Sequence, residues 1–279
     1  MQKEIELKAA PQPFSFSRWI DKNFKYLPPI FITLILVVGQ LAYGILDGYS
    51  GLFAAIGATI ITEVILSKVI LGKRKPISSA YMTGTSVAML IRSNLAWPFA
   101  VTGFLSIASK YVLRYKGHHI WNPSLFGITW MLALHSPSVA GLSIQWGSNL
   151  AAASIIWLVG LIVVSRAKRL HVTVAYVISF IILAYIRCLI TGDPFLAELA
   201  PLTGPMYQLF IFLMITDPPT GVSTRKGRVI VVVLVAILEF VFRLFHSIYA
   251  PFYALFIIGP LAKYLDLRRL DKQAKKKLA

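Results

Sequence analysis

Cysteine and charged residues are scarce in this chain of 279 residues. The single cysteine, Cys188, excludes an intrachain disulfide and any metal site built from several cysteines. Only 14% of the residues are charged, whereas 57% are hydrophobic and the mean hydropathy is +0.72. One soluble core could not bury so much apolar surface, because typical soluble domains are about a quarter charged. Lipid supplies a second apolar environment, so the sequence predicts an all-α integral membrane protein.

The sequence also lacks the local patterns of a self-contained catalytic centre. It contains no nucleophile-plus-base arrangement, no glycine-rich phosphate-binding loop and no zinc-ligand spacing. An enzyme that acts alone is therefore the least favoured class. Residues 1–27 are polar and mixed in charge, which is unlike a cleavable signal peptide, so the first apolar run is expected to direct insertion.

Basic residues outnumber acidic ones by 28 to 11, which gives a formal net charge of +17. Nucleic-acid binding would gather these cations on one polar face. Here they form small groups between apolar runs, a distribution typical of charges that set membrane topology. The partners predicted from charge alone are therefore the lipid bilayer and no nucleic acid.

About ten transmembrane helices are predicted from the apolar runs. The runs fall near residues 28–46, 51–71, 80–91, 95–113, 120–134, 150–165, 172–190, 205–216, 229–245 and 250–265. Those at 80–91 and 205–216 are too short to cross a bilayer, which needs about twenty helical residues. Each runs into polar or proline-rich sequence. Two such interrupted helices at matching positions point to a central binding site.

The basic groups predict the orientation of these runs. If the N-terminus is cytoplasmic and the runs alternate, 25 of the 28 basic residues fall on the cytoplasmic side, and only Arg92, Arg187 and Arg243 do not. The cytoplasmic groups are Lys3, Lys8, Arg18, Lys22, Lys25; Lys68, Lys73, Arg74, Lys75; Lys110, Arg114, Lys116; Arg166, Lys168, Arg169; Arg225, Lys226, Arg228; and Lys263, Arg268, Arg269, Lys272, Lys275, Lys276, Lys277. Both termini are thus expected on the cytoplasmic side of the cell inner membrane.

A repeat is indicated by the sequences that begin at Arg114 and Arg243. Both continue with a histidine and then with isoleucine, an aromatic residue, any residue and proline. Five is an odd number of spans, so two five-helix repeats would be inverted relative to each other. We expect a cytoplasmic N-terminal segment (1–27), one transmembrane domain (28–266, with repeat halves of about 28–135 and 150–266) and a basic cytoplasmic tail (267–279).

Ionisable residues within the apolar runs are candidates for function, because their charge is costly in lipid. Glu239 lies four residues before Arg243, and the spacing favours a structural ion pair on one helix face. Glu63 has no close partner in sequence, so it either binds a cation or proton or caps a neighbouring helix. His118 and His119 are adjacent and would point in different directions, so interfacial histidines are favoured over a metal or haem site.

The most specific local feature is the segment ITDPPTGVSTRKGR at residues 215–228. Asp217 ends a short helix, and two prolines, three hydroxyl residues and three basic residues follow it. Hydroxyl donors, free backbone N–H groups and positive charge together suit an anionic or polar ligand. The alternative is a cytoplasmic turn with ordinary topology charges.

This segment resembles the TDP-x-T-x-S/T-T-x-x-G-R stretch of the D subunit of Rnf electron-transport complexes. The same family contains the B subunit of the sodium-translocating NADH:quinone reductase, and we refer to both as the Rnf/Nqr family. KGHHIWNPSLFGI resembles the family's Gly-x-x-x-Phe-Asn-Pro-Ala-x-x-Gly motif through Asn122, Pro123 and Gly127. MTGTSVAML at 82–90 and RAKRLHVTVAYVISF at 166–180 resemble a short helix and a basic turn of the family, and the order is kept from about residue 50 to 270.

The resemblance implies a urea-transporter-like fold of ten helices in inverted repeats, in which flavins and partner subunits move electrons, often coupled to Na⁺ or H⁺ movement. It assigns the central site to two stretches. Their residues are Asn122, Pro123, Gly127, Thr216, Asp217, Pro218, Thr220, Ser223, Thr224 and Arg228.

The sequence departs from the family at the covalent flavin site. Family members carry FMN on a threonine in a long loop between the fifth and sixth helices, whereas the corresponding stretch here, 135–149, is short and contains no threonine. The family's Tyr-Pro-Asp-Gly before the last helix is replaced by Ile-Tyr-Ala-Pro at 248–251. FMN or riboflavin is therefore expected to bind noncovalently if it binds at all.

The leading hypothesis is a membrane subunit of an Rnf/Nqr-type complex that works with other membrane and flavoprotein subunits in flavin-associated electron transfer, with ion translocation as a coupled activity. Two alternatives stay open. One is a channel or carrier for a small polar solute with a urea-transporter-like fold. The other is a structural scaffold in a divergent redox or biosynthetic complex.

Overall fold

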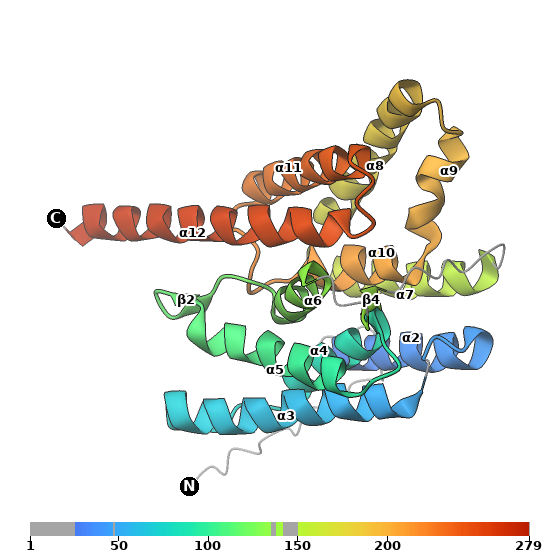
Figure 1. The fold of residues 1–279 in the computed structure, drawn as a ribbon. Helices are drawn as coiled ribbons and strands as arrows, with labels where there is room; N and C mark the ends of the chain where they lie inside the picture. The colour runs from blue at the N-terminus through green and yellow to red at the C-terminus, as the bar shows by residue number, and fades with distance from the viewer. Residues whose placement is uncertain (1–25, 47, 135–137, 142–149, 279) are drawn as a thin grey trace, which may run out of the picture.

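The computed structural model describes residues 26–46, 48–134, 138–141 and 150–278, so nearly all of the predicted segment 1–27 and most of the loop 135–149 lie outside it. The described chain is mostly helical (Figure 1). Its helices are α2 (Leu27–Tyr43), α3 (Tyr49–Leu71), α4 (Ser78–Leu90), α5 (Trp97–Val112), α6 (Pro123–Ala133), α7 (Leu150–Arg166), α8 (Leu170–Thr191), α9 (Phe195–Leu199), the 3-10 helix η2 (Ala200–Thr203), α10 (Pro205–Leu209), the π-helical turn η3 (Phe210–Met214), α11 (Arg225–Leu244) and α12 (Ala250–Leu278).

Every predicted apolar run contains helix. Prolines open α2, α5 and α6, as expected at a position whose N–H has no helical partner. Among the described residues, three helices are long and apolar enough to cross a membrane, namely α3, α8 and α12. The bent pair formed by 195–203 and 206–214, with a 64° change of direction, supplies a fourth when counted as one span. The chain is thus compatible with an all-α, multi-pass membrane protein, while the full count of ten spans stays a prediction.

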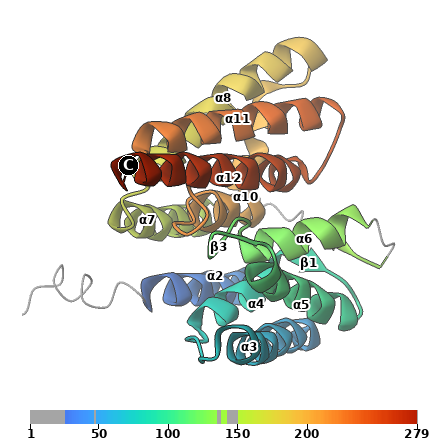
Figure 2. The ribbon, with the colours of Figure 1, turned by 90° about the vertical axis from the view of Figure 1, so that its left-hand side faces the viewer.

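The helices form two groups that follow the order of the chain. Figure 2 shows α2–α5 in the lower part, α8, α11 and α12 in the upper part, and α6, α7 and α10 between them. In the first group, α2–α6, α3 packs against α4 and α5, and α5 packs against α6. In the second group, α7–α12, α8 packs against α11, and α11 against α12. The groups meet where α2 contacts α7 and where α6 contacts α12.

Two short helices end inside the bundle, as the sequence predicts. Helix α4 stops at Leu90, and the next residues form strand β1 (Ile91–Arg92), which pairs antiparallel with β4 (Ala140–Gly141). In the second group the chain stops being helical after Met214, and α11 begins at Arg225. The β1–β4 pairing gives the non-helical backbone after α4 hydrogen-bond partners within the protein.

Small residues let the helices of the first group approach one another closely. A Cβ atom at Gly84 of α4 would lie 2.7 Å from Ile56 Cα of α3. A Cβ atom at Gly127 of α6 would lie 2.5 Å from the Thr102 carbonyl oxygen of α5. Because helix association in lipid depends on such close packing, these glycines fix the positions of α4 and α6.

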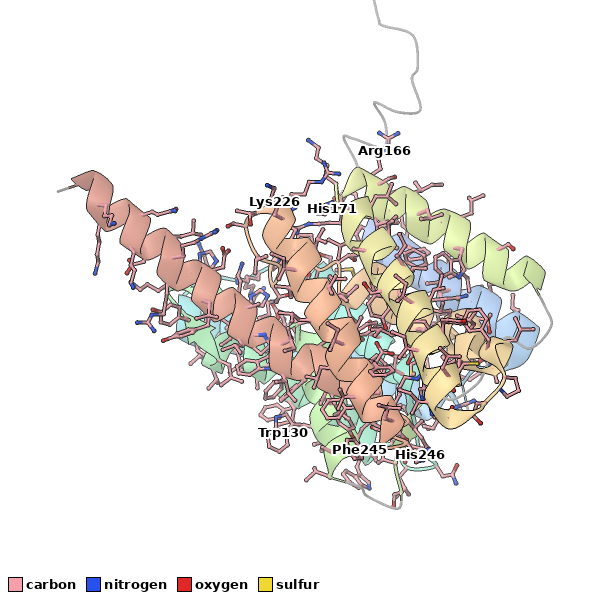
Figure 3. The ribbon with its side chains drawn as sticks, turned by 90° about the horizontal axis from the view of Figure 1, so that it is seen from above. Trp130, Arg166, His171, Lys226, Phe245 and His246 are labelled. Atoms are coloured by element: carbon pink, nitrogen blue, oxygen red, sulfur yellow. The ribbon has the colours of Figure 1, made fainter. Side chains whose placement is uncertain are left out.

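The two ends of the bundle differ in chemistry. Arg166, His171 and Lys226 lie at one end, which we call the basic end, and Trp130, Phe245 and His246 lie at the other (Figure 3). The strands β2 (Arg114–Tyr115) and β3 (His118–His119) form a hairpin, and its Lys116 reaches Asp271 of α12 at 2.8 Å. The hairpin of the first half is thus tied to the basic C-terminal part of α12, and which face is cytoplasmic stays a prediction.

Candidate central binding site

A cavity of 350 Å³ lies where the two groups of helices meet. Its apolar wall comes from α2, α7 and η3, through side chains such as Ile32, Val163 and Phe212. Its polar wall carries the hydroxyls of α4 and the start of α6, the Lys110 ammonium group, and the segment that follows η3. The polar residues are Ser79, Thr83, Ser86, Lys110, His119, Asn122, Ser124, Thr216 and Asp217. The volume is within the range of about 300–1,000 Å³ that small-molecule sites occupy.

Asn122 is held in place by the beginning of α6. Its Oδ1 accepts hydrogen bonds from the Leu125 N–H at 3.1 Å and from the Ser124 hydroxyl at 2.8 Å, so it caps the helix. Pro123 follows in the first turn. The Asn-Pro-Ser sequence is therefore a helix start, and it places the Asn122 and Ser124 side chains at the cavity wall.

Asp217 is partly buried beside Asn122 and accepts a hydrogen bond from the Thr220 hydroxyl at 2.8 Å. Burial raises the pKa of the Asp217 carboxyl to about 6, against the opposing effects of hydrogen bonds from Thr220 and Asn122 and of the nearby Arg169 and Lys263. The carboxyl therefore titrates close to neutral pH.

The rest of the 215–224 segment is held by charged side chains from two helices. Lys263 of α12 donates to the Gly221 carbonyl at 2.9 Å. Arg228 of α11 donates to the carbonyls of Val222 and Ser223 at 2.9 and 2.8 Å. Asp266 of α12 accepts from the Ser223 N–H at 2.7 Å and from its hydroxyl at 2.9 Å. The segment is thus a fixed wall rather than a free loop.

The sequence-predicted residues divide into three groups. Five line the 350 Å³ cavity: Asn122, Pro123, Thr216, Asp217 and Pro218. Thr220 and Arg228 line a smaller cavity of 40 Å³, which Asn122 also borders. Gly127 packs against α5, Thr224 caps α11, and Ser223 bonds to Asp266, so these three line neither cavity.

Several cavity residues were missed by the sequence analysis. Lys110 was counted as a topology charge, and His119 as an interfacial histidine, yet both line the cavity. Burial, together with nearby Lys110, lowers the pKa of His119 to about 4, so its imidazole is neutral at pH 7. The hydroxyl-rich sequence Thr-Gly-Thr-Ser at 83–86 was the available signal, because hydroxyls in an apolar helix mark a packed or polar face.

Glu63 has the partner that the local sequence did not reveal. The Lys110 ammonium group donates to both carboxylate oxygens, at 2.8 and 2.9 Å, and to the Ser79 hydroxyl at 3.3 Å. The Tyr111 hydroxyl donates to Glu63 Oε1 at 2.8 Å. The Glu63 side chain is 0% exposed and that of Lys110 is 9% exposed, so α3 and α5 share a buried ion pair beside the cavity.

The predicted ion pair between Glu239 and Arg243 is wrong. Glu239 accepts hydrogen bonds from the hydroxyls of Tyr176, at 2.5 Å, and Tyr207, at 2.7 Å. Arg243 instead pairs with Glu198 at 3.1 Å, and Arg187 pairs with the same carboxylate at 2.5 Å. The i, i+4 spacing does place Glu239 and Arg243 on one face of α11. Each of them nevertheless finds its partner on another helix, Glu239 on α8 and α10 and Arg243 on α9.

Part of the chain is similar in sequence to known membrane-complex subunits. No protein-family model matches the chain. It is similar to the D subunit of the ion-translocating oxidoreductase complex of Cronobacter sakazakii, with 31% identity over 113 residues, and to that of Escherichia coli O1:K1, with 28% over 112 residues. Each alignment covers 40% of this chain and 31% of the relative, so the chain matches under a third of the length of these relatives.

A longer alignment exists with the corresponding D subunit of Methanosarcina acetivorans, with 24% identity over 211 residues. It covers 70% of this chain and 71% of that protein. These similarities support kinship with the D subunits of ion-translocating oxidoreductase complexes. That kinship is the one that the sequence motifs predict.

Proposed function

We propose that the chain is a membrane subunit of an Rnf/Nqr-type electron-transport complex and that its central cavity holds a noncovalent flavin. The observation that carries the proposal is the cavity itself, which is lined by Asn122, Thr216 and Asp217 from the two motif stretches. The similarity to D subunits over most of the chain supports the choice of complex. Ion translocation belongs to the proposal as a coupled activity of the complex, since the names of the relatives include it.

The cavity walls fit the chemistry of a flavin. Phe212, Val163 and Ile32 offer an apolar surface for the flat ring system, and the polar lining offers hydroxyl donors and the Lys110 ammonium group for its carbonyl oxygens. A bound flavin would supply one- and two-electron transfer. The chain's own residues would orient the ring, exclude water from it, and hold a proton at Asp217, whose carboxyl has a pKa of about 6.

The arrangement of helices supports two five-helix halves. The second and fourth helices of each half pack together, as α3 with α5 and as α8 with α11, and the fourth packs with the fifth in both. In an inverted repeat the two broken helices approach a shared centre. Residues of α4 and of the chain that follows η3 both line the cavity, which supports this relation.

The proposed topology places the basic end in the cytoplasm and the domain in the cell inner membrane. Arg169, Arg228 and Lys263 come from different elements and influence one another electrostatically at that end. Keeping so many cations on one face is what the positive-inside rule demands. Both termini and the basic tail beyond residue 266 then face the cytoplasm, where flavoprotein partner subunits would reach them.

The proposal is tested by titration and by partner capture. Riboflavin fluorescence should be quenched by the purified protein and far less by a Ser86→Leu variant, whose larger side chain would occupy the cavity. A Ser165→Leu variant is the control, because Ser165 is exposed on α7 outside the cavity. Capture of the chain from native membranes should bring down a flavoprotein. Equal quenching by both variants, or capture without a flavoprotein, would contradict the proposal.

A polar solute channel is the second candidate function. Ser79, Thr83 and Ser86 present hydroxyls along one side of α4 toward the cavity, a lining suited to a small neutral solute. Proteoliposomes that contain this chain alone would take up such a solute if it is a channel. Impermeable vesicles would leave the flavin proposal as the better one.

A further inference from the structure

A second concave site lies at the basic end, on the outer surface of the bundle. It is a groove of 810 Å³ between the first turns of α8 and α11. Its polar lining consists of Lys168, His171, Arg225 and Arg228. Figure 3 places His171 and Lys226, from the first turns of the same two helices, close together at this end. None of its lining residues belongs to the 350 Å³ cavity, so the groove is a separate site.

The polar part of the groove has unused donors. Within the described ranges, the side chains of Lys168 and Arg225 form no hydrogen bond or ion pair, and no carboxylate lines the groove. The His171 Nε2 atom is shielded from solvent and lacks a hydrogen-bond partner among those residues. Both helices also begin beside the groove, and negative charge is favoured near a helix N-terminus. The chemistry therefore calls for an anion with several oxygen atoms.

The remaining lining of the groove is apolar. Leu170, Val174 and Ile178 are spaced four residues apart on α8, so they form one stripe along the helix, and Ala175 lies beside it. Their exposed fractions rise along the chain from 40% through 45% to 52%. The stripe leads away from the basic end toward the middle of α8. A free phosphate or an acidic peptide would leave this surface uncovered, whereas an acyl chain would cover it.

We propose that this groove binds an anionic glycerophospholipid. The headgroup phosphate accepts hydrogen bonds from Lys168, Arg225 and His171, and one acyl chain lies along the stripe of α8. Basic pockets between transmembrane helices bind anionic headgroups in this way. The site is independent of the flavin proposal, since it needs neither the central cavity nor a partner subunit.

The bound lipid would also act on the central region through Arg228. This guanidinium group lines the groove and the 40 Å³ cavity, and it donates to the carbonyls of Val222 and Ser223. A phosphate beside Arg228 would hold it in place and so restrain the 215–224 segment. Lipid occupancy is thereby linked to the wall of the central site.

Lipid binding is measured by native mass spectrometry of the full chain in detergent, with phosphatidylglycerol and phosphatidylcholine as probes. The wild type should prefer phosphatidylglycerol, and a Lys168→Gln/Arg225→Gln variant should bind it about tenfold or more weakly, because each cation near the headgroup contributes on the order of 1 kcal/mol. A Lys272→Gln/Lys276→Gln variant is the matched control. It removes the same charge from exposed positions of α12 outside the groove, and its affinity should be unchanged.

A second variant keeps the charges and fills the groove. Val174→Trp should weaken phosphatidylglycerol binding, yet leave the net charge unaltered. The proposal is overturned if both double variants lose affinity equally, which would indicate diffuse charge, or if the wild type shows no preference between the lipids. Full competition by millimolar inorganic phosphate would also overturn it, since the site would then be for free phosphate.

Discussion

The buried ion pair between Glu63 and Lys110 allows the sharpest test of how the first half is held together. Both carboxylate oxygens lie within 2.9 Å of the ammonium nitrogen, and the pair is almost fully removed from solvent. Replacing Glu63 with glutamine would leave the Lys110 charge buried without a counter-charge. Breaking such a pair costs about 3–5 kcal/mol, because the remaining ion keeps its desolvation penalty.

A double-mutant cycle consists of Glu63→Gln, Lys110→Met and the double variant Glu63→Gln/Lys110→Met. Each single change should lower the free energy of unfolding by about 3–5 kcal/mol, and the double change by much less than the sum, since no charge is then stranded. Unfolding in detergent, followed by tryptophan fluorescence, measures all three. The exposed pair between Lys116 and Asp271 is the control, and its loss should cost less than about 1 kcal/mol. Additive single effects would refute the reasoning.

Three further predictions concern the site and its supports. Asp217→Asn should remove a pH dependence of the free energy of unfolding. Because the pKa of this carboxyl is raised to about 6 in the folded state, the wild type should lose stability relative to the variant as the pH rises from about 4 to 6. Above that range the difference in free energy between the two proteins should stay constant. Gly127→Ala should destabilise the protein by about 1–3 kcal/mol, because the added methyl group would overpack against α5. Gly57→Ala is the control and should be neutral or stabilising, because a Cβ atom there would have nothing within 4 Å. Equal effects of the two substitutions on thermal unfolding would contradict the close packing. Tyr207→Phe should cost about 1–3 kcal/mol, because Glu239 loses one of its two hydrogen bonds, and unchanged chemical denaturation would argue against that bond.

Much of the fold follows from local sequence signals. Apolar runs locate the helices because length and hydropathy are local properties, and the two short runs at 80–91 and 205–216 correspond to helix that stops at Leu90 and Met214. The Asn-Pro pair at Asn122 predicts the start of α6 for the same reason, since capping needs only neighbouring residues.

The partners of buried charges could not be predicted in this way. Glu63 meets a lysine 47 residues later, and Glu239 meets a tyrosine 63 residues earlier. Such pairings depend on how α3 and α5, or α8 and α11, pack, and sequence spacing carries no information about that. Residues that line the cavity were predicted where a sequence motif contains them, as at Asn122 and Thr216, and were missed where only packing places them there, as at Lys110.

A flavin held in the central cavity without a covalent bond is the feature on which the proposed function depends most. The measurement is a visible absorption spectrum of the detergent-purified protein, recorded before and after acid precipitation. We predict flavin absorbance in the native sample and its complete release into the acid supernatant, because the 135–149 stretch contains no threonine for attachment. A colourless native sample would contradict the bound flavin, and absorbance that stays with the acid pellet would contradict its noncovalent binding.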